Sequence, residues 1–285
     1  MASSLPPQMD GITVADLPDR YVYRGTHYAD LILRDGFPEH YAQLHEVLAE
    51  FTIDVTELQA GGGNRTPFVA RFDAGLSDYG WGKRNFDIAT TIDGEVVAKV
   101  RSHEIDMFKE GSDDHTFPGI AVEMEWNNKD PFFDRDLTNF YALHRAGALA
   151  VGVIVTRGPH LQRVLKQLVR NSKGAEKYGE SSTHWNKLTP RVDLGGGGEC
   201  PLLLIGIELE RITGFDISDL TWMAEELEKA DDDLTHWRER GLRYKEVRAR
   251  RAEFLEKARA LLPPTPDANS DLEGVESVPD FDSDG

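Results

Sequence analysis

Apolar residues alternate or run continuously in four segments of the chain, which predicts four β-strands. In residues 119–126, large apolar side chains at every second position alternate with Ala or Glu, as on a strand with one apolar face. The segments 149–156 and 201–209 are continuous apolar runs, which are typical of strands buried in the centre of a sheet. A β-branched stretch at 95–107 follows a turn and predicts a strand that ends at Asp106.

Other segments carry apolar residues at helical spacing. This spacing predicts helices at about 37–51, 68–79, 134–145 and 161–170. Strands and helices that succeed one another in this order predict an α/β fold in which a mixed β-sheet is flanked by helices. From Ser218 onward the same spacing recurs in a highly charged background. We therefore expect added C-terminal helices, which pack against the parent domain or against a second subunit.

The length of 285 residues and the hydrophobic content of 40% suit one large domain or two small ones. We expect one domain over 1–262, with a catalytic core at about 61–210 and a helical part at about 216–262. The prolines from Pro263 onward end helical structure, and the acidic remainder, 263–285, is expected to be disordered. The single cysteine, Cys200, is expected to pack in the core.

Localisation follows from two absences in the sequence. No apolar run approaches the length of about 18 residues that a membrane span needs. The N-terminus lacks a basic and hydrophobic targeting pattern. We therefore expect a cytoplasmic protein with no membrane partner.

The alternating strand carries the strongest chemical signal, a Glu-x-Glu pair. Glu123 and Glu125 share one face at a separation of about 7 Å, so their charges repel by about 2 kcal/mol at an effective dielectric of 20. A divalent cation reverses that repulsion, and Mg²⁺ is usually held by one or two carboxylates with water and substrate phosphate. Asp106 supplies a third acid; Asp114 and its neighbour Asp113, in a loop, compete with it. The alternative is a strand with one solvated face.

Five segments of the chain resemble the BglII/BstYI family of type II restriction endonucleases, within the PD-(D/E)xK nuclease superfamily. They are residues 102–109, 122–137, 151–157, 177–184 and 195–201, with a weaker similarity from 61–68 to 81–86. The resemblance implies a PD-(D/E)xK nuclease core and Mg²⁺-dependent cleavage of double-stranded DNA by a homodimer. It also implies a palindromic site with a GATC core and, for a restriction enzyme, a cognate DNA methyltransferase as partner.

The same resemblance assigns roles at the site. Asp106 and Glu123 correspond to metal ligands, and Glu125 takes the place of the superfamily lysine, so all three are candidate catalytic residues. The stretch from Lys109 to Gly119 is longer than usual for the family. This leaves open whether Asp106 or Asp114 is the first metal ligand.

The net charge of −18 opposes binding to DNA phosphate unless positive charge is concentrated locally. Residues 157–191 carry eight Lys and Arg against two Glu. The tail at 267–285 carries seven acids and no base. The charge distribution therefore permits a basic DNA-binding region, although such a stretch can also be an ordinary solvated face.

Candidate DNA-contacting residues lie in two polar segments, one after the Glu-x-Glu strand and one at 177–187. Asparagine can pair with adenine, and hydroxyl, imidazole and lysine groups can contact base edges or phosphate. The candidates are Asn127, Asn128, Lys129, Lys177, Ser181, Ser182, Thr183, His184 and Lys187. Ordinary turns would have the same composition. Two other functions stay open, a structure-selective DNA repair nuclease and a non-catalytic DNA-binding protein.

Overall fold

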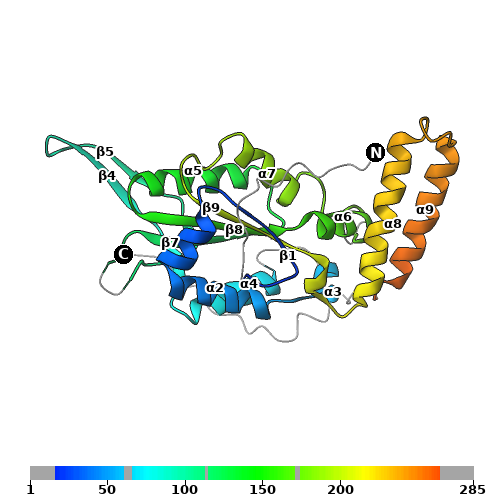
Figure 1. The fold of residues 1–285 in the computed structure, drawn as a ribbon, viewed down its shortest axis with the longest axis horizontal. Coiled ribbons are helices and arrows are strands. Elements are labelled where there is room, and N and C mark those ends of the chain that lie inside the picture. The colour runs from blue at the N-terminus through cyan, green and yellow to red at the C-terminus, as the bar shows by residue number, and fades with distance from the viewer. Residues whose placement is uncertain (1–16, 61–65, 113–114, 171–173, 264–285) are drawn as a thin grey trace, which may run out of the picture.

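A six-stranded mixed sheet lies at the centre of the structure (Figure 1). The computed structural model describes residues 17–60, 66–112, 115–170 and 174–263. In spatial order the strands are β1 (Tyr21–Gly25), β9 (Leu202–Ile207), β8 (Leu149–Arg157), β7 (Gly119–Glu125), β6 (Ile105–Lys109) and β3 (Gly82–Arg84). The central strands β7, β8 and β9 are parallel, and the outer strands pair antiparallel with their neighbours. The predicted mixed sheet flanked by helices is confirmed.

Helices cover both faces of this sheet. On one face lie α5 (Phe132–Arg145) and α7 (Trp185–Asp193). On the opposite face, a second cluster of buried hydrophobic residues includes residues of α2 (Pro38–Glu50), α4 (Pro67–Ser77) and α6 (Pro159–Leu168). The shorter elements are α1 (Ala29–Leu31), the π-helical turn η1 (Ile32–Gly36), β2 (Ile53–Asp54), α3 (Val55–Gln59), the 3₁₀ turn η2 (Leu209–Arg211) and β10 (Ile212–Thr213).

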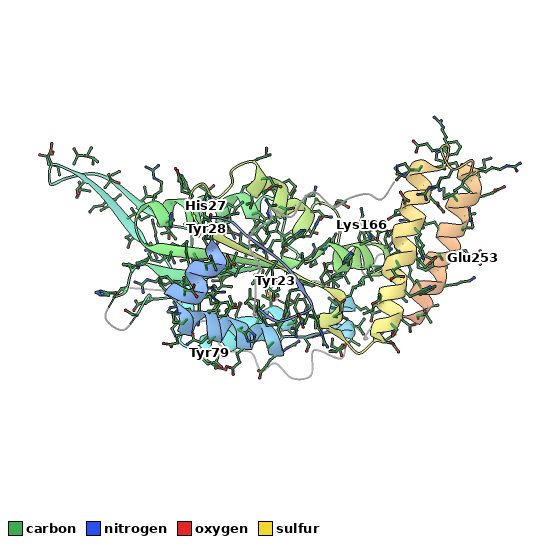
Figure 2. The ribbon with its side chains drawn as sticks, viewed as in Figure 1. Tyr23, His27, Tyr28, Tyr79, Lys166 and Glu253 are labelled. Atoms are coloured by element: carbon green, nitrogen blue, oxygen red, sulfur yellow. The ribbon has the colours of Figure 1, made fainter. Side chains whose placement is uncertain are left out.

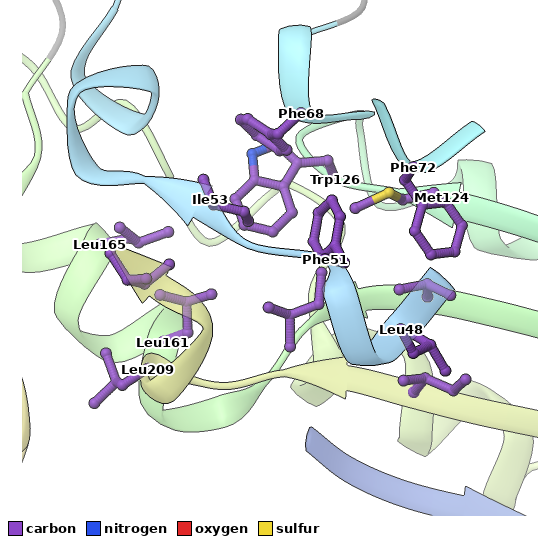
Figure 3. Packing of buried hydrophobic residues seen from close by; sticks show 14 of the residues in the cluster. Leu48, Phe51, Ile53, Phe68, Phe72, Met124, Trp126, Leu161, Leu165 and Leu209 are labelled. Carbon is purple, nitrogen blue, oxygen red and sulfur yellow. The ribbon is translucent and has the colours of Figure 1, made fainter. Parts of the chain in front are cut away.

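The alternation predicted for 119–126 is present, and both faces of β7 are buried. Val122, Met124 and Trp126 belong to the core cluster that contains α2 and α4. The Trp126 ring meets the Phe68 ring edge to face, with the ring centroids 4.8 Å apart (Figure 3). Glu123 and Glu125 therefore point to the opposite face, towards α5, as alternation requires.

The strand predicted at 95–107 is wrong as a single element. Its first part is β5 (Glu95–Arg101), which pairs with β4 (Asp87–Ile92) in a separate hairpin that projects from the main sheet (Figure 1). The chain then enters β6, so Asp106 lies near the start of a strand and not at its end. The β-branched pattern continues through both β5 and β6, and it does not indicate that the two strands belong to different sheets.

The hairpin is closed at both ends by local interactions. Asp93 and Gly94 have positive φ values of 49° and 87°, as a two-residue turn between right-handed twisted strands requires. At its base the amide of Ser102 donates to the carbonyl of Phe86 at 2.8 Å, and the Ser102 hydroxyl accepts from the Phe86 amide at 2.9 Å. These bonds mark the point where the chain leaves one sheet for the other.

The C-terminal part is a pair of helices, α8 (Ile217–His236) and α9 (Tyr244–Leu261), which we call the α8–α9 hairpin. Gly241, with φ +67°, lies in the connection, at the predicted break. The hairpin packs on α6, and Arg259 donates to the carbonyl of Gln167 at 2.8 Å. Apolar residues of α8 and α9 join the main core cluster: Leu220, Met223, Ala224, Leu227, Leu255 and Ala258. Of the two alternatives, packing against the parent domain is therefore the one observed.

Cys200 is buried, as predicted. Among the described helices, none combines the length and apolar character needed to cross a bilayer. Asp113, Asp114 and the acidic segment after Pro263 lie outside the described residues. The expected disorder of the tail therefore stays a prediction.

Candidate active site and DNA-contacting loops

Two of the predicted catalytic acids lie next to each other on neighbouring antiparallel strands. Met107 of β6 pairs with Val122 of β7, which brings Asp106 beside Glu123. The Asp106 amide donates to Glu123 Oε1 at 3.3 Å. The Glu123 side chain is buried, whereas the Asp106 side chain is 46% exposed. The pair therefore joins a buried carboxylate to one that faces solvent.

The third predicted acid is held by polar partners. Glu125 accepts a hydrogen bond from Asn128 Nδ2 at 2.7 Å and one from Arg135 Nη2 at 3.2 Å. Arg135 also donates from Nε to Asp136 Oδ1 at 2.8 Å. One guanidinium thus connects Glu125 with Asp136, a carboxylate that comes from α5.

Asp136 and Arg135 were not among the predicted site residues, although the sequence holds a signal for Asp136. Phe133, Asp136, Leu137 and Phe140 follow helical spacing, and all four are buried. An acid among apolar residues on the buried face of a helix is rare unless it has a partner. Its Oδ2 atom is buried and has no hydrogen-bond partner within the described structure.

Negative charge at this site is only partly compensated. Burial raises the pKa of Glu123 well above its ordinary value, and the charges of Asp136, Asp106 and Glu125 raise it further. Burial and the charge of Asp136 raise the pKa of Glu125 to about 8, against the opposing effect of Asn128 and Arg135. Burial also raises the pKa of Asp136, with Arg135 opposing. Lys83, whose Nζ lies 3.6 Å from Asp106 Oδ1, is the other nearby base.

This donor set fits a hard divalent cation. Within the described ranges, no three or more His, Cys, Asp or Glu side chains are gathered in a metal-binding arrangement. Glu125 is bonded to Asn128 and Arg135, so Asp106 and Glu123 are the two neighbouring carboxylates that could hold an ion. Two carboxylates are sufficient for Mg²⁺, whose remaining ligands are commonly water and phosphate. Burial is the first cause of the raised pKa of Glu123 and the neighbouring carboxylates add to it, so a cation held there would lower that pKa.

The two polar segments that carry the candidate DNA contacts lie side by side. Lys129 and Ser182 form an isolated antiparallel bridge. The Thr183 amide donates to the Asn128 carbonyl at 2.9 Å, and the Asp130 amide donates to the Ser181 carbonyl at 3.0 Å. Because Asn128 also bonds Glu125, the paired loops are connected directly to β7. We call residues 127–130 and 178–184 the paired loops.

A buried arginine holds the second of these loops. Arg157 Nη2 donates to Ser182 Oγ at 2.7 Å and to the Thr183 carbonyl at 2.6 Å. Its guanidinium carbon lies 5.0 Å from the Tyr178 ring centroid and 5.7 Å from that of Trp126. Burial lowers the pKa of Arg157 to about 9, which leaves it charged at neutral pH. The sequence-based prediction counted Arg157 only among the bases of the 157–191 stretch; the signal missed was its place at the end of a buried strand.

The nine candidate DNA contacts differ in accessibility. Three are exposed and make no side-chain bond to the catalytic acids: Asn127, Lys129 and Ser181. Asn128 is exposed but donates to Glu125, and Lys187 is partly buried. Lys177 donates from Nζ to the carbonyls of Leu58 and Ala60, and burial lowers its pKa to about 8.

The remaining candidates, Ser182, Thr183 and His184, are buried. Burial, and then the charge of Arg157, lower the pKa of His184 to about 4, so the imidazole is neutral at pH 7. In the described structure, Thr183 Oγ1 and both His184 ring nitrogens lack partners within hydrogen-bond distance, and the nearest acid to the ring, Glu180, has its Oε2 3.7 Å from Nε2. These groups therefore retain unused hydrogen-bonding capacity beside the catalytic strand.

The basic region 157–191 carries less free positive charge than its composition predicts. Lys166 pairs with Glu180 at 2.5 Å, and Arg163 pairs with Glu228 at 3.1 Å. Arg191 pairs with two acids at 2.9 and 3.3 Å. Since Arg157 and Lys177 are also engaged, most of the described bases in this region are neutralised or bonded to backbone carbonyls.

Comparison with known proteins places these features in one family. A family model for restriction endonuclease BglII/BglIII matches residues 21–207. The matched span contains all six strands of the main sheet, the three predicted catalytic acids and the paired loops. No curated protein matches the sequence. The chain belongs to the BglII/BglIII family of restriction endonucleases and is therefore a site-specific deoxyribonuclease.

Proposed function

We propose that this chain is a Mg²⁺-dependent type II restriction endonuclease that acts as a homodimer on a palindrome with a GATC core. The observation that supports the metal dependence is the pairing of Asp106 with the buried Glu123 across β6 and β7. A buried carboxylate among further acids is costly without positive charge nearby. A divalent cation would supply such charge, with Asp106 and Glu123 as its ligands.

In this proposal, three acids have separate roles: two bind the metal ion and the third accepts a proton. Asp106 and Glu123 hold the ion, which when bound supplies positive charge to the phosphate that is cleaved. In its ionised form, which a cation held beside it would favour, Glu125 accepts a proton from the attacking water; its raised pKa makes that carboxylate a stronger base than an ordinary glutamate. Asn128 and Arg135 position that carboxylate through their hydrogen bonds.

DNA recognition is assigned to the paired loops. Asn127 and Ser181 are exposed beside the catalytic strand and are suited to base edges, and Lys129 is suited to phosphate. Thr183 and His184 reach a base only if the loop shifts, and their unpartnered polar atoms favour such contacts. Arg157 positions the loop and does not itself touch DNA.

Three elements of the proposal rest on the resemblance to the GATC-cutting enzymes and not on distances in this chain. They are the GATC core, the homodimer and the cognate methyltransferase. Two-fold symmetry supplies a physical link between the first two, because a dimer with one site per subunit cuts both strands of a palindrome at equivalent positions.

The proposal is tested by digesting plasmid and genomic DNA with the purified protein in Mg²⁺ and in EDTA. Discrete fragments in Mg²⁺ alone, whose sequenced ends share a palindrome containing GATC, are the expected result. Fragments from a palindrome without GATC would refute the specificity and keep the nuclease. Nicking without any shared sequence would instead support a repair nuclease.

A further inference from the structure

The α8–α9 hairpin is acidic along α8 and basic from its connection into the start of α9. Residues 216–233, most of α8, carry eight acids and one lysine. Residues 238–251, which form the connection and the start of α9, carry seven Lys and Arg against two Glu. On a chain with a net charge of −18, such a basic segment is unusual. It lies beyond the span matched by the family model.

Some of these bases are neutralised by acids within the hairpin. Arg240 pairs with Asp232 and with Asp233, and Arg251 pairs with Asp231 at 2.8 Å. Arg243 lies 3.4 Å from an acid of its own first helical turn. These pairs account for part of the positive charge and tie the connection to the acidic helix.

Four bases are exposed and form no ion pair within the described part of the chain. We call them the basic tip: Arg238, Lys245, Arg248 and Arg250. Arg238 lies over the Trp237 ring, with its guanidinium carbon 4.9 Å from the centroid. Lys245 and Arg248 are one helical turn apart, so they are neighbours on α9.

The basic tip lies on the same side of the sheet as α5 and α7 (Figure 1). That side bears Asp136 on α5 and faces the catalytic carboxylates of β7. Side chains with nitrogen at their ends project from this end of the hairpin (Figure 2). Asp231, Asp232 and Asp233 lie at this end too, but they are paired with Arg240 and Arg251, and one exposed acid, Glu239, lies beside Arg238. The four unpaired bases therefore give this end of the hairpin net positive charge on the side of the active site.

We propose that the basic tip binds the phosphate backbone of duplex DNA that flanks the recognition site. This inference rests on the proposed function, since it assumes that the paired loops hold DNA near β7. Arginine matches phosphate geometry with its planar set of donors, and unpaired surface bases release counterions from DNA when they bind it. The basic region 157–191 leaves little free charge for this purpose, because its described bases are largely engaged.

The test measures binding of the full-length chain to a duplex without GATC, in EDTA, over a series of salt concentrations. The double variant Arg248→Ala/Arg250→Ala removes two free charges. The matched control Lys229→Ala/Lys257→Ala removes two charges of the same hairpin that are paired with Glu226 and Glu253 at 2.8 and 2.7 Å. Thermal unfolding of each variant shows that the fold is retained.

The double variant is expected to reduce the slope of log affinity against log salt by about 1.8, since each phosphate that a base neutralises contributes about 0.9 to the slope. The control is expected to keep the wild-type slope, and both variants are expected to keep the wild-type cut position. Equal slopes for the two variants, with wild-type cleavage intact, would overturn the role of the basic tip alone. A wild-type chain that neither binds nor cuts duplex DNA would overturn the proposed function as well.

Discussion

Replacement of Glu123 by glutamine should stabilise the metal-free protein while it abolishes cleavage. Glutamine keeps an oxygen that can accept the hydrogen bond from the Asp106 amide, but it carries no charge. A like charge about 7 Å away, as on Glu125, costs about 2 kcal/mol at an effective dielectric of 20. Glu123→Gln removes the cost of burying this charge and its repulsion by Asp136, Asp106 and Glu125, so we expect the free energy of unfolding at pH 8.5 in EDTA to rise by at least about 2 kcal/mol.

The sign of the pH dependence follows from the raised pKa of Glu123. Because the folded protein binds this proton more tightly than the unfolded chain, wild-type stability falls as pH rises from the ordinary glutamate value to the raised one. At pH 5 the folded carboxyl is protonated, so the gain from Glu123→Gln should be under about 1 kcal/mol. Thermal unfolding in EDTA at the two pH values measures both gains.

Glu253→Gln on α9 serves as the control, because Glu253 is exposed and pairs only with a surface lysine (Figure 2). Its effect on stability should be near zero at both pH values. A gain of about 2 kcal/mol corresponds to a rise in Tm of about 4–8 °C in a protein of this size. A loss of stability in Glu123→Gln, or equal gains at pH 5 and 8.5, would contradict the idea of a charge-crowded site.

Three further predictions concern other parts of the chain. Asp106→Asn should abolish Mg²⁺-dependent cleavage and Asp114→Asn should leave it near wild type in a plasmid assay; the reverse result would move the first ligand to the loop. Arg157→Met should leave the buried Thr183 carbonyl without its donor, at a cost of about 1–3 kcal/mol. It should also weaken binding to the cognate duplex more than to a random one, and a uniform loss would refute a positioning role. Truncation after Pro266 should raise non-specific affinity at low salt without changing the cut site, and equal affinities would leave the tail without this role.

The sequence pattern was sufficient for the parts of the fold that depend on local alternation or continuous apolar runs. The strands β7, β8 and β9 follow this rule, since each is buried and is apolar at the positions that face the core. The same rule failed at 95–107, because a β-branched stretch looks alike in a projecting hairpin and in the central sheet. Sheet membership is set by long-range pairing, which a local pattern does not contain.

In the candidate site, too, the residues that depend on a local pattern could be predicted, and those that depend on contacts between distant segments could not. Strand periodicity and family resemblance both point to Glu123 and Glu125, and the structure places Asp106 beside Glu123 although the strand predicted to end at Asp106 is two strands. The catalytic roles of these three acids stay predictions. The burial of Arg157 could not be predicted, because it depends on Tyr178 and Trp126, which pack around it from other segments. A count of charges in a stretch cannot reveal which charges already have partners.

The packing of the α8–α9 hairpin on α6 has a consequence for how members of this family can be shortened or recombined. The family match ends at residue 207, but the apolar face of α6 continues into the added helices. Leu161 and Leu165 share one core cluster with Met223 and Leu227. A chain ended at residue 207 would leave this face of α6 in water and would be prone to association. We therefore expect the added helices of this chain to unfold together with the sheet, and any replacement of α6 here to need its covering helices as well.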